Sequence, residues 1–212
     1  MIIEAFIPDW ASPRAHAGAL AEALEPFCKT TILSSFDVPF SVQWAEAVSK
    51  FTGDIFLWAM ADIGFRDPVE DIFVSMYRAY TRGDIVMYAP NLDYTAMVYD
   101  TSKLRQVDLG LFEVAGTDLI FVSLHRDLLE LLPPLGCNTH AWAYDYLMTH
   151  IAHSKLGKKV VRDYNFMIAH PYGKAYSEPE AIAQQNEWIH HLSFVHQMGI
   201  REQQAIQERT HA

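Results

Sequence analysis

Residues 52–62, "TGDIFLWAMAD", join a turn, an apolar run and a terminal carboxylate. The Thr-Gly pair at the start is a signal that ends the preceding helix. The run from Ile55 to Ala61 is almost wholly apolar, which is typical of a central strand buried on both faces of a parallel sheet. Open α/β sheets bind ligands at the carboxyl ends of their strands, and Asp62 stands at such an end. Asp62 is therefore a candidate ligand for a hard metal ion, and the alternative is that it caps the following turn.

Strands and helices alternate around this run. Apolar runs bounded by turn residues predict strands at residues 2–7, 29–34, 54–61, 84–88 and 119–124. Helical periodicity and start signals, with Ser12 as N-cap of the first helix, predict helices at residues 12–24, 42–51 and 69–81. Pro90 is expected to end the strand at 84–88. Because such alternation forms parallel sheets with right-handed crossovers, we predict an α/β fold with a Rossmann-like, mostly parallel central sheet flanked by helices.

The second half of the chain is more mixed. It predicts short strands at 96–99 and 111–114, helices at 126–132 and 141–156, and strand fragments at 158–162 and 166–169. From Pro179 onward the pattern is helical. We expect residues 1–176 to form one domain and residues 177–212 to form a C-terminal helical arm. Neither the dinucleotide-binding nor the P-loop glycine motif is present.

Composition limits the classes of function. The chain has 212 residues, of which 50% are hydrophobic, and a net charge of -10. A strongly acidic balance argues against broad binding to nucleic acid, which requires a basic face. One local group of basic residues is interpreted as a solvated helix end, namely Lys155, Lys158, Lys159 and Arg162.

The sequence also bears on the compartment. Two cysteines, Cys28 and Cys137, are too few for a disulfide framework, and a reducing compartment is the default. The longest apolar runs are too short to span a bilayer. The amino terminus carries neither a basic segment nor a signal-peptide core. We therefore expect a soluble, cytoplasmic protein.

Three side chains at the ends of predicted elements carry the chemistry. Asp62 ends the central strand, Asp145 lies near the start of the helix at 141–156, and His170 ends the strand at 166–169. If Asp62 and His170 lie close together in the fold, they can provide two protein ligands for a divalent cation. Asp145 is then free to act as a general base. The alternatives are a favourable charge in the first turn of a helix for Asp145 and a loop histidine for His170.

Two stretches, taken together, resemble GT-A fold glycosyltransferases that use nucleotide sugars, of the family 2-like kind. "VQWAEAVSKFTGDIFLWAMAD" (42–62) is similar to the part of these enzymes that leads into their D-x-D motif. "AGTDLIFVSLHRDLLELL" (115–132) and "THAWAYDYLMTHIAHSKLGKKVVRDYNFMIAHP" (139–171) resemble the strand, the helix, the W-x-x-D element and the downstream histidine. The resemblance covers about residues 1 to 176.

The resemblance implies a role for each matching position. Asp62 would bind Mn²⁺ or Mg²⁺ bridging the nucleotide diphosphate, and His170 would be the second protein ligand. Asp145 would deprotonate the acceptor hydroxyl. The nucleotide and the donor sugar would contact residues at the ends of other elements, namely Pro8 and Asp9 in the turn after the first strand, Asp37, Thr117 and Asp118.

The resemblance implies a hexosyltransferase-like enzyme that moves a sugar from a UDP- or GDP-linked donor to a hydroxyl acceptor. A single base, with no second nucleophilic carboxylate evident, favours inversion at the anomeric carbon. The chain departs from the motif at Met60, which replaces the first acid of D-x-D. The alternative function is therefore a catalytically degenerate protein that binds a nucleotide or nucleotide sugar on the same fold.

Two further features remain open or unassigned. The arm carries an apolar stripe at helical spacing that either covers the sheet or packs on a second copy of the chain in a homodimer, made of Trp188, Ile189, Leu192, Val195 and Met198. Two histidine pairs, 150/153 and 190/191, invite metal binding. Because no third ligand stands near the i, i+3 pair 150/153 in the sequence, we interpret that pair as surface residues.

Overall fold

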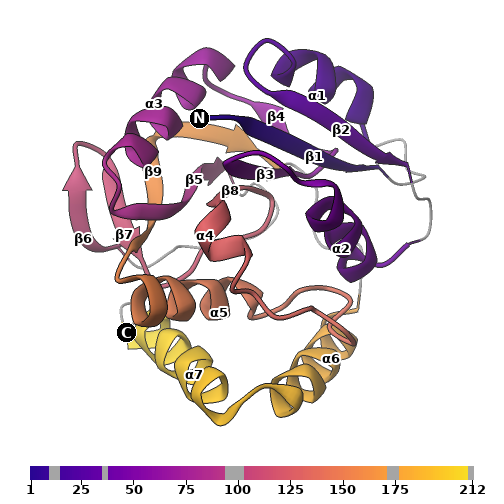
Figure 1. Ribbon diagram of the computed structural model, residues 1–212, viewed down its shortest axis with the longest axis vertical. Helices are drawn as coiled ribbons and strands as arrows, with labels where there is room; N and C mark the ends of the chain where they lie inside the picture. Colours follow the sequence, from indigo (N-terminus) through magenta and orange to yellow (C-terminus); the bar gives the residue numbers. More distant parts are fainter. Residues whose placement is uncertain (10–14, 35–37, 94–102, 171–176, 210–212) are drawn as a thin grey trace.

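The computed structural model describes every residue outside 10–14, 35–37, 94–102, 171–176 and 210–212. A nine-stranded sheet runs through the described residues in the order β2-β1-β3-β8-β5-β9-β7-β6, and β4 pairs with β9 (Figure 1). The strands are β1 (Ile3–Asp9), β2 (Lys29–Ser34), β3 (Ile55–Ala59), β4 (Gly64–Phe65), β5 (Ile85–Asp93), β6 (Lys103–Asp108), β7 (Leu111–Val114), β8 (Phe121–His125) and β9 (Lys159–Ala169). The helices are α1 (Ala17–Leu24), α2 (Phe40–Lys50), α3 (Val69–Thr81), α4 (Arg126–Leu129), α5 (Tyr144–Ile151), the π-helical turn η1 (Ala152–Leu156), α6 (Glu178–His191) and α7 (Phe194–Arg209).

The described strands form a mixed sheet with three parallel and five antiparallel pairings, so the sheet is less parallel than predicted. β1 pairs in parallel with both β2 and β3, and β5 pairs in parallel with β9. β8 is antiparallel to both of its neighbours, β3 and β5. Its first residue, Phe121, pairs with Ala59 at the end of β3. The chain that enters β8 therefore arrives at the edge of the sheet where β3 ends, which is the edge that carries Asp62.

Helices cover both faces of the sheet. In Figure 1, α1 and α3 lie on one face, and α2, α4 and α5 lie on the other. Each face has its own buried apolar cluster, one built with residues of α1 and α3 and one built with residues of α2, α4 and α5. Continuous apolarity in residues 55–59 follows from this arrangement, because all five side chains of β3 are buried between two helical layers.

The C-terminal helices α6 and α7 lie on the side of α5 that faces away from the sheet (Figure 1). Trp188, Ile189 and Ile200 belong to the same buried cluster as residues of α2 and α5. This confirms that the stripe covers the domain over part of its length. Val195 and Met198, farther along the stripe, are 56% and 46% exposed. The homodimer stays a prediction.

Two prolines lie inside strands that were expected to end before them. Pro8 pairs with Leu33 inside β1, and Pro90 pairs with Asp163 inside β5. A proline lacks an N–H, so it is tolerated where only one side of the strand is paired. The β1–β3 pairing stops at Phe6 and the β5–β8 pairing stops at Tyr88, so each proline lies beyond the double pairing.

Other boundaries also differ from the prediction. The first helix begins at Ala17, with His16 as its N-cap, and the predicted start at Ser12 falls outside the described residues. The two predicted fragments at 158–162 and 166–169 form one strand, β9, whose register against β5 shifts between them. The predicted strand at 96–99 lies outside the described residues.

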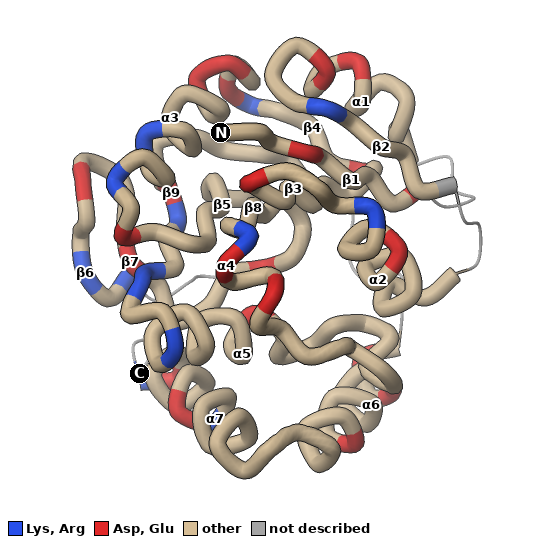
Figure 2. Tube along the Cα trace, viewed as in Figure 1, with Lys and Arg blue, Asp and Glu red and all other residues tan. Residues whose placement is uncertain are grey.

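Basic positions are interspersed with acidic ones along the chain (Figure 2). In the described part of the chain, every helix is too short or too polar to cross a membrane.

One buried carboxylate ties the first three strands together. Glu4 in β1 accepts hydrogen bonds from the Thr52 amide at 2.9 Å and the Thr52 hydroxyl at 2.8 Å, and its Oε1 lies 3.2 Å from Lys29 Nζ. Burial acts to raise the pKa of Glu4, but the bonds from Thr52 and the ammonium of Lys29 outweigh it and lower the pKa below its ordinary value. Thr52 immediately precedes Gly53, so this network fixes the turn that leads into β3.

We expect Glu4→Gln to lower the free energy of unfolding at neutral pH by about 1–2 kcal/mol, because charge-assisted bonds become neutral ones. A lowered folded-state pKa contributes stability that is present above the unfolded pKa and lost as pH falls through the folded pKa. The difference between Glu4→Gln and the unmodified protein should therefore shrink below about pH 4. Urea unfolding across this range measures it, with the exposed Glu22→Gln as the matched control. A difference that stays constant with pH would contradict the network.

Candidate active site

The pairing of β4 with β9 brings Asp62 and His170 together. In this antiparallel pair Gly64 lies opposite Ala169 and Phe65 opposite Ile168. Asp62 precedes Gly64 by two residues and His170 follows Ala169, so the register sets the two side chains at the same end of the ladder. The Oδ2 atom of Asp62 lies 3.3 Å from Nε2 of His170. The structure thus brings together the two residues predicted as metal ligands.

This pair has the features of a cation site. Asp62 and His170 keep only 9% and 13% of their side-chain surface exposed. The second carboxylate oxygen of Asp62, Oδ1, is buried and has no hydrogen-bond partner among the described residues. Buried carboxylate oxygens are normally satisfied, so an orphaned one requires an explanation. A divalent cation, which prefers carboxylate oxygen and accepts imidazole nitrogen, fits this pair of donors.

Met60 shows why this edge offers one carboxylate instead of two. Its backbone amide donates to the Ile120 carbonyl at 2.8 Å, which continues the β3–β8 ladder. Its side chain is partly buried and packs against both apolar clusters. The position that holds the first acid of D-x-D in the related motif is therefore used here for packing.

Asp145 lies in the first turn of α5, after a strained turn. Ala141 and Ala143 have φ angles of 57° and 62°, in the left-handed region that non-glycine residues seldom adopt. Such conformations cost on the order of 1–2 kcal/mol and persist only where packing imposes them. Both alanines are buried, as is Tyr144 beside them. The packing of this turn sets the direction from which Asp145 enters the site.

The carboxylate of Asp145 is buried against the loop before β8. A Cβ atom added at Gly116 would meet Asp145 Oδ2 at 2.7 Å, so only glycine leaves room for this side chain. Burial raises the pKa of Asp145 to about 7, and the neighbouring Asp118 carboxylate raises it too. The Tyr146 amide and the Arg162 guanidinium act in the opposite direction. The carboxyl group can therefore take up or release a proton near neutral pH.

Arg162 holds the loop that carries Thr117 and Asp118. Its guanidinium donates to the Thr117 hydroxyl at 2.7 Å and forms an ion pair with Asp118. Thr117 is fully buried, and the Asp118 side chain is 13% exposed. Asp118 also accepts a hydrogen bond from the Ile120 amide at 3.0 Å, which fixes the entry into β8.

The interpretation of Arg162 as part of a solvated helix end is wrong. Arg162 lies within β9, pairs with Ala89 and Phe112, and has no exposed surface. The signal was present in the sequence, since Arg162 follows Val160 and Val161 in a predicted strand. An arginine inside a buried strand requires an acidic partner, and that requirement would have pointed to Asp118.

Asp163, the next residue of β9, is a second buried charge that sequence reasoning missed. It accepts hydrogen bonds from the Tyr88 hydroxyl at 3.0 Å and the Ser75 hydroxyl at 2.5 Å. It also accepts from the Asn165 amide at 3.0 Å. Arg162 and Asp163 are consecutive in β9, so their side chains point to opposite faces of the sheet. Each face therefore receives one buried charge that has partners of its own.

Three predicted positions remain, namely Pro8, Asp9 and Asp37. Pro8 and Asp9 are the last residues of β1 and not a turn after it, and the Asp9 carbonyl accepts from Gln43 at 3.3 Å. Asp37 lies outside the described residues. The ranges 10–14, 35–37, 94–102 and 171–176 follow β1, β2, β5 and the end of β9 in the chain.

Comparison with known proteins supports the fold. No protein-family model and no curated protein sequence matches the chain. Among solved structures, A197 from STIV is 16% identical with a TM-score of 0.56, over 82% of this chain and 87% of that one. S. aureus TarS 1-349 in complex with UDP-GlcNAc is 11% identical with a TM-score of 0.58, over 99% and 71%. Mannosyltransferase PcManGT from Pyrobaculum calidifontis, in complex with GDP-Man and Mn²⁺, is 10% identical with a TM-score of 0.54, over 96% and 73%.

These similarities, at such low identity, show the fold. The chain has a mixed α/β structure in which helices flank a central sheet, and this is the GT-A-like fold of glycosyltransferases. The predicted fold class is confirmed. The roles predicted for individual residues are not tested by the comparisons and enter the proposal below.

The raised pKa of Asp145 predicts how stability depends on pH. A raised folded-state pKa contributes stability that is present below the unfolded pKa and lost as pH rises through the folded pKa, here between about 4 and about 7. Asp145→Asn removes this loss, so it should be more stable than the unmodified protein at about pH 8, by at most roughly 4 kcal/mol.

Urea unfolding at about pH 5 and about pH 8 measures this difference. Asp108→Asn is the matched control, because the Asp108 side chain is 66% exposed. Parallel pH profiles for the unmodified protein and Asp145→Asn would show that Asp145 is not held with a raised pKa.

Proposed function

We propose that this protein is a glycosyltransferase that moves a sugar from a UDP- or GDP-linked donor to a hydroxyl acceptor, with inversion at the anomeric carbon. The observation that carries the proposal is the convergence of Asp62 and His170 at the carboxyl edge of a GT-A-like sheet, where one buried oxygen of Asp62 has no hydrogen-bond partner among the described residues. Two neighbours in the structural comparison were crystallised with UDP-GlcNAc and with GDP-Man and Mn²⁺, which supports this class of donor.

Asp62 and His170 would hold Mn²⁺ or Mg²⁺ at this edge. A bound divalent cation offsets the negative charge of a nucleoside diphosphate and so makes it a better leaving group. The 3.3 Å separation of Asp62 Oδ2 and His170 Nε2 would let both atoms contact one ion. Because the pair is largely buried, water competes little for the same oxygens.

Asp145 is the proposed general base. It accepts the proton of the acceptor hydroxyl as that oxygen bonds to the anomeric carbon and the bond from this carbon to the diphosphate oxygen breaks. The nucleoside diphosphate leaves with the bonding electron pair. A base with a pKa near the working pH is well matched to this step, and the pKa of Asp145 is raised to about 7. Displacement in line with the departing group inverts the anomeric carbon.

The loop held by Arg162 positions the sugar in this proposal. Thr117 and Asp118 are fixed by the buried guanidinium, so their backbone and side-chain groups need little reordering on binding. Pro8 and Asp9 at the end of β1, and Asp37 after β2, are proposed to contact the nucleobase. Two free cysteines support a reducing compartment, and we propose that the reaction takes place in the cytoplasm.

Two substitutions separate binding from transfer. We expect Asp62→Asn to abolish the stabilisation that a nucleoside diphosphate gives in the presence of Mn²⁺, because the carboxylate donor is lost. Asp145→Asn should keep this stabilisation and lose transfer by at least about 100-fold, because the base is lost. Thermal unfolding with UDP and GDP, with Mn²⁺ or with EDTA, measures the first effect. Release of nucleoside diphosphate from each nucleotide sugar measures the second.

The outcomes discriminate between the functions. Metal-dependent binding with no turnover in the unmodified protein would support the degenerate binding protein suggested by Met60. Equal binding and turnover in the unmodified protein and both variants would contradict the site assignment. Asp67→Asn is the control, because Asp67 lies near this edge and its carboxylate is engaged by the Met167 amide at 2.6 Å.

A further inference from the structure

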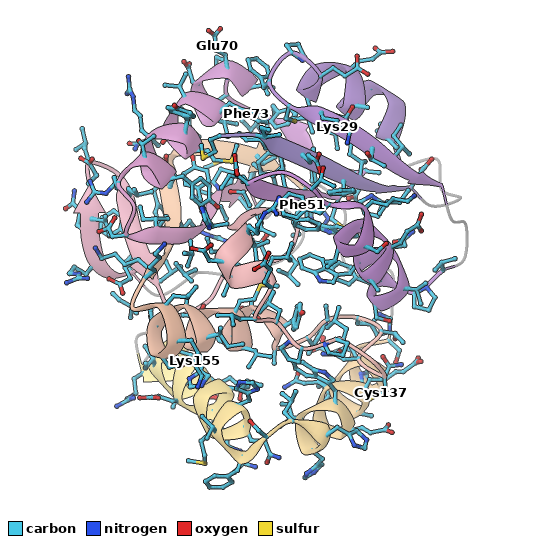
Figure 3. The ribbon with its side chains drawn as sticks, viewed as in Figure 1. Lys29, Phe51, Glu70, Phe73, Cys137 and Lys155 are labelled. Atoms are coloured by element: carbon cyan, nitrogen blue, oxygen red, sulfur yellow. The ribbon has the colours of Figure 1, made fainter. Side chains whose placement is uncertain are left out.

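A second group of metal-ligating side chains lies far from Asp62 in the sequence. Cys137, Glu187 and His191 each offer one donor atom, and the three donors lie within 4.8 Å of one another. Glu187 and His191 are four residues apart on α6 and so share one face of the helix. Cys137 comes from the segment before α5, and Figure 3 labels it beside α6.

Hydrogen bonds on both sides of Cys137 hold its segment against α6. On one side, the Trp188 indole donates to the Pro134 carbonyl at 3.2 Å. On the other, the Thr139 amide donates to Gln184 Oε1 at 3.2 Å, and the Thr139 hydroxyl also contacts this oxygen. Trp188 is buried against the core, so the helix face that meets the segment is fixed. The segment that carries Cys137 and the helix that carries Glu187 and His191 are therefore held together by contacts that do not involve the three donors.

The donor set selects a class of metal. A thiolate, an imidazole and a carboxylate together suit Zn²⁺, whereas Mg²⁺, Ca²⁺ and Mn²⁺ prefer oxygen. Donors around a tetrahedral zinc ion lie about 3.4–3.6 Å apart, given ordinary zinc–ligand distances. The three donor atoms lie within 4.8 Å of one another. Because Glu187 and His191 are exposed, small rotations of their side chains can shorten these distances to the spacing around zinc.

We propose that Cys137, Glu187 and His191 bind one Zn²⁺ ion, with water as the fourth ligand, and that this ion clamps α6 to the segment before α5. On binding, the Cys137 thiol loses its proton to solvent and the thiolate becomes a zinc ligand. The clamp joins the C-terminal helices to the part of the chain that leads into Asp145. Since the site shares no residue with the Asp62–His170 pair, it does not rest on the proposed transferase function.

The proposed site includes His191, a member of one of the two histidine pairs. His191 is joined in this site by Cys137, which lies several elements earlier in the sequence and could not be paired with it by spacing.

The other histidine pair, 150/153, lies outside this site. His150 is buried beneath α7, where a Cβ at Gly199 would meet its ring at 2.2 Å, so its interpretation as a surface residue is wrong.

Titration of the full-length chain with Co²⁺, a spectroscopic substitute for Zn²⁺, tests the site. A thiolate ligand gives an intense near-ultraviolet charge-transfer band that the Asp62–His170 pair, which has no sulfur, cannot produce. We expect the band to saturate at one Co²⁺ per chain, to be displaced by Zn²⁺ and to be absent in Cys137→Ser. Cys28→Ser should keep it, because Cys28 is not among the three clustered donors and partial burial raises its thiol pKa to about 12.

Two neighbouring positions on α6 provide a matched pair. His191→Ala should weaken Co²⁺ binding at least about tenfold, because a ligand is lost, whereas His190→Ala should leave it unchanged. Zn²⁺ should raise the melting temperature of the unmodified protein and of Cys28→Ser by more than that of Cys137→Ser, which keeps only the Asp62–His170 pair as a cation site. Absence of the charge-transfer band in the unmodified protein, or equal bands in the two cysteine variants, would overturn the proposal.

Discussion

The buried positive charge of Arg162 is the constraint on which much of this structure depends. A guanidinium with no exposed surface inside a strand is tolerated only if its charge is compensated. Thr117 and Asp118 provide that compensation, and in doing so they fix the loop that enters β8. The loop in turn brings Gly116 against Asp145. One buried cation therefore sets the position of a strand, a loop and the proposed base.

Charge balance also explains the protonation behaviour of this region. Asp118 and Asp145 are two carboxyl groups near one guanidinium, and Arg162 is already paired with Asp118. Asp145 is left with burial and a neighbouring negative charge, and both raise its pKa. Asp62, which follows the end of β3, has an imidazole partner instead. The different surroundings of Asp62 and Asp145 therefore suit them to the different roles proposed above, metal binding and proton transfer.

The C-terminal helices also help to position the proposed base. Trp188 packs its ring against Tyr144, with centroids 5.7 Å apart, and Tyr144 is the first residue of α5. The next residue is Asp145. The arm therefore supports the helix that carries the proposed base, and the contacts around Cys137 reinforce the same junction. This dependence gives the arm a physical role in shaping the site as well as in covering the core.

Local sequence determined most of the elements. The strands at 29–34 and 111–114 and the helix at 69–81 have the predicted bounds, because hydrophobic periodicity and turn residues act over a few neighbouring positions. The buried central strand with a terminal acid was also readable. Tertiary structure alone decided which side chains meet. The β4–β9 register joined Asp62 to His170, the burial of β9 turned Arg162 into a partner of Asp118, and the packing of α6 brought His191 to Cys137. These contacts join residues far apart in the chain, and no short-range pattern specifies them.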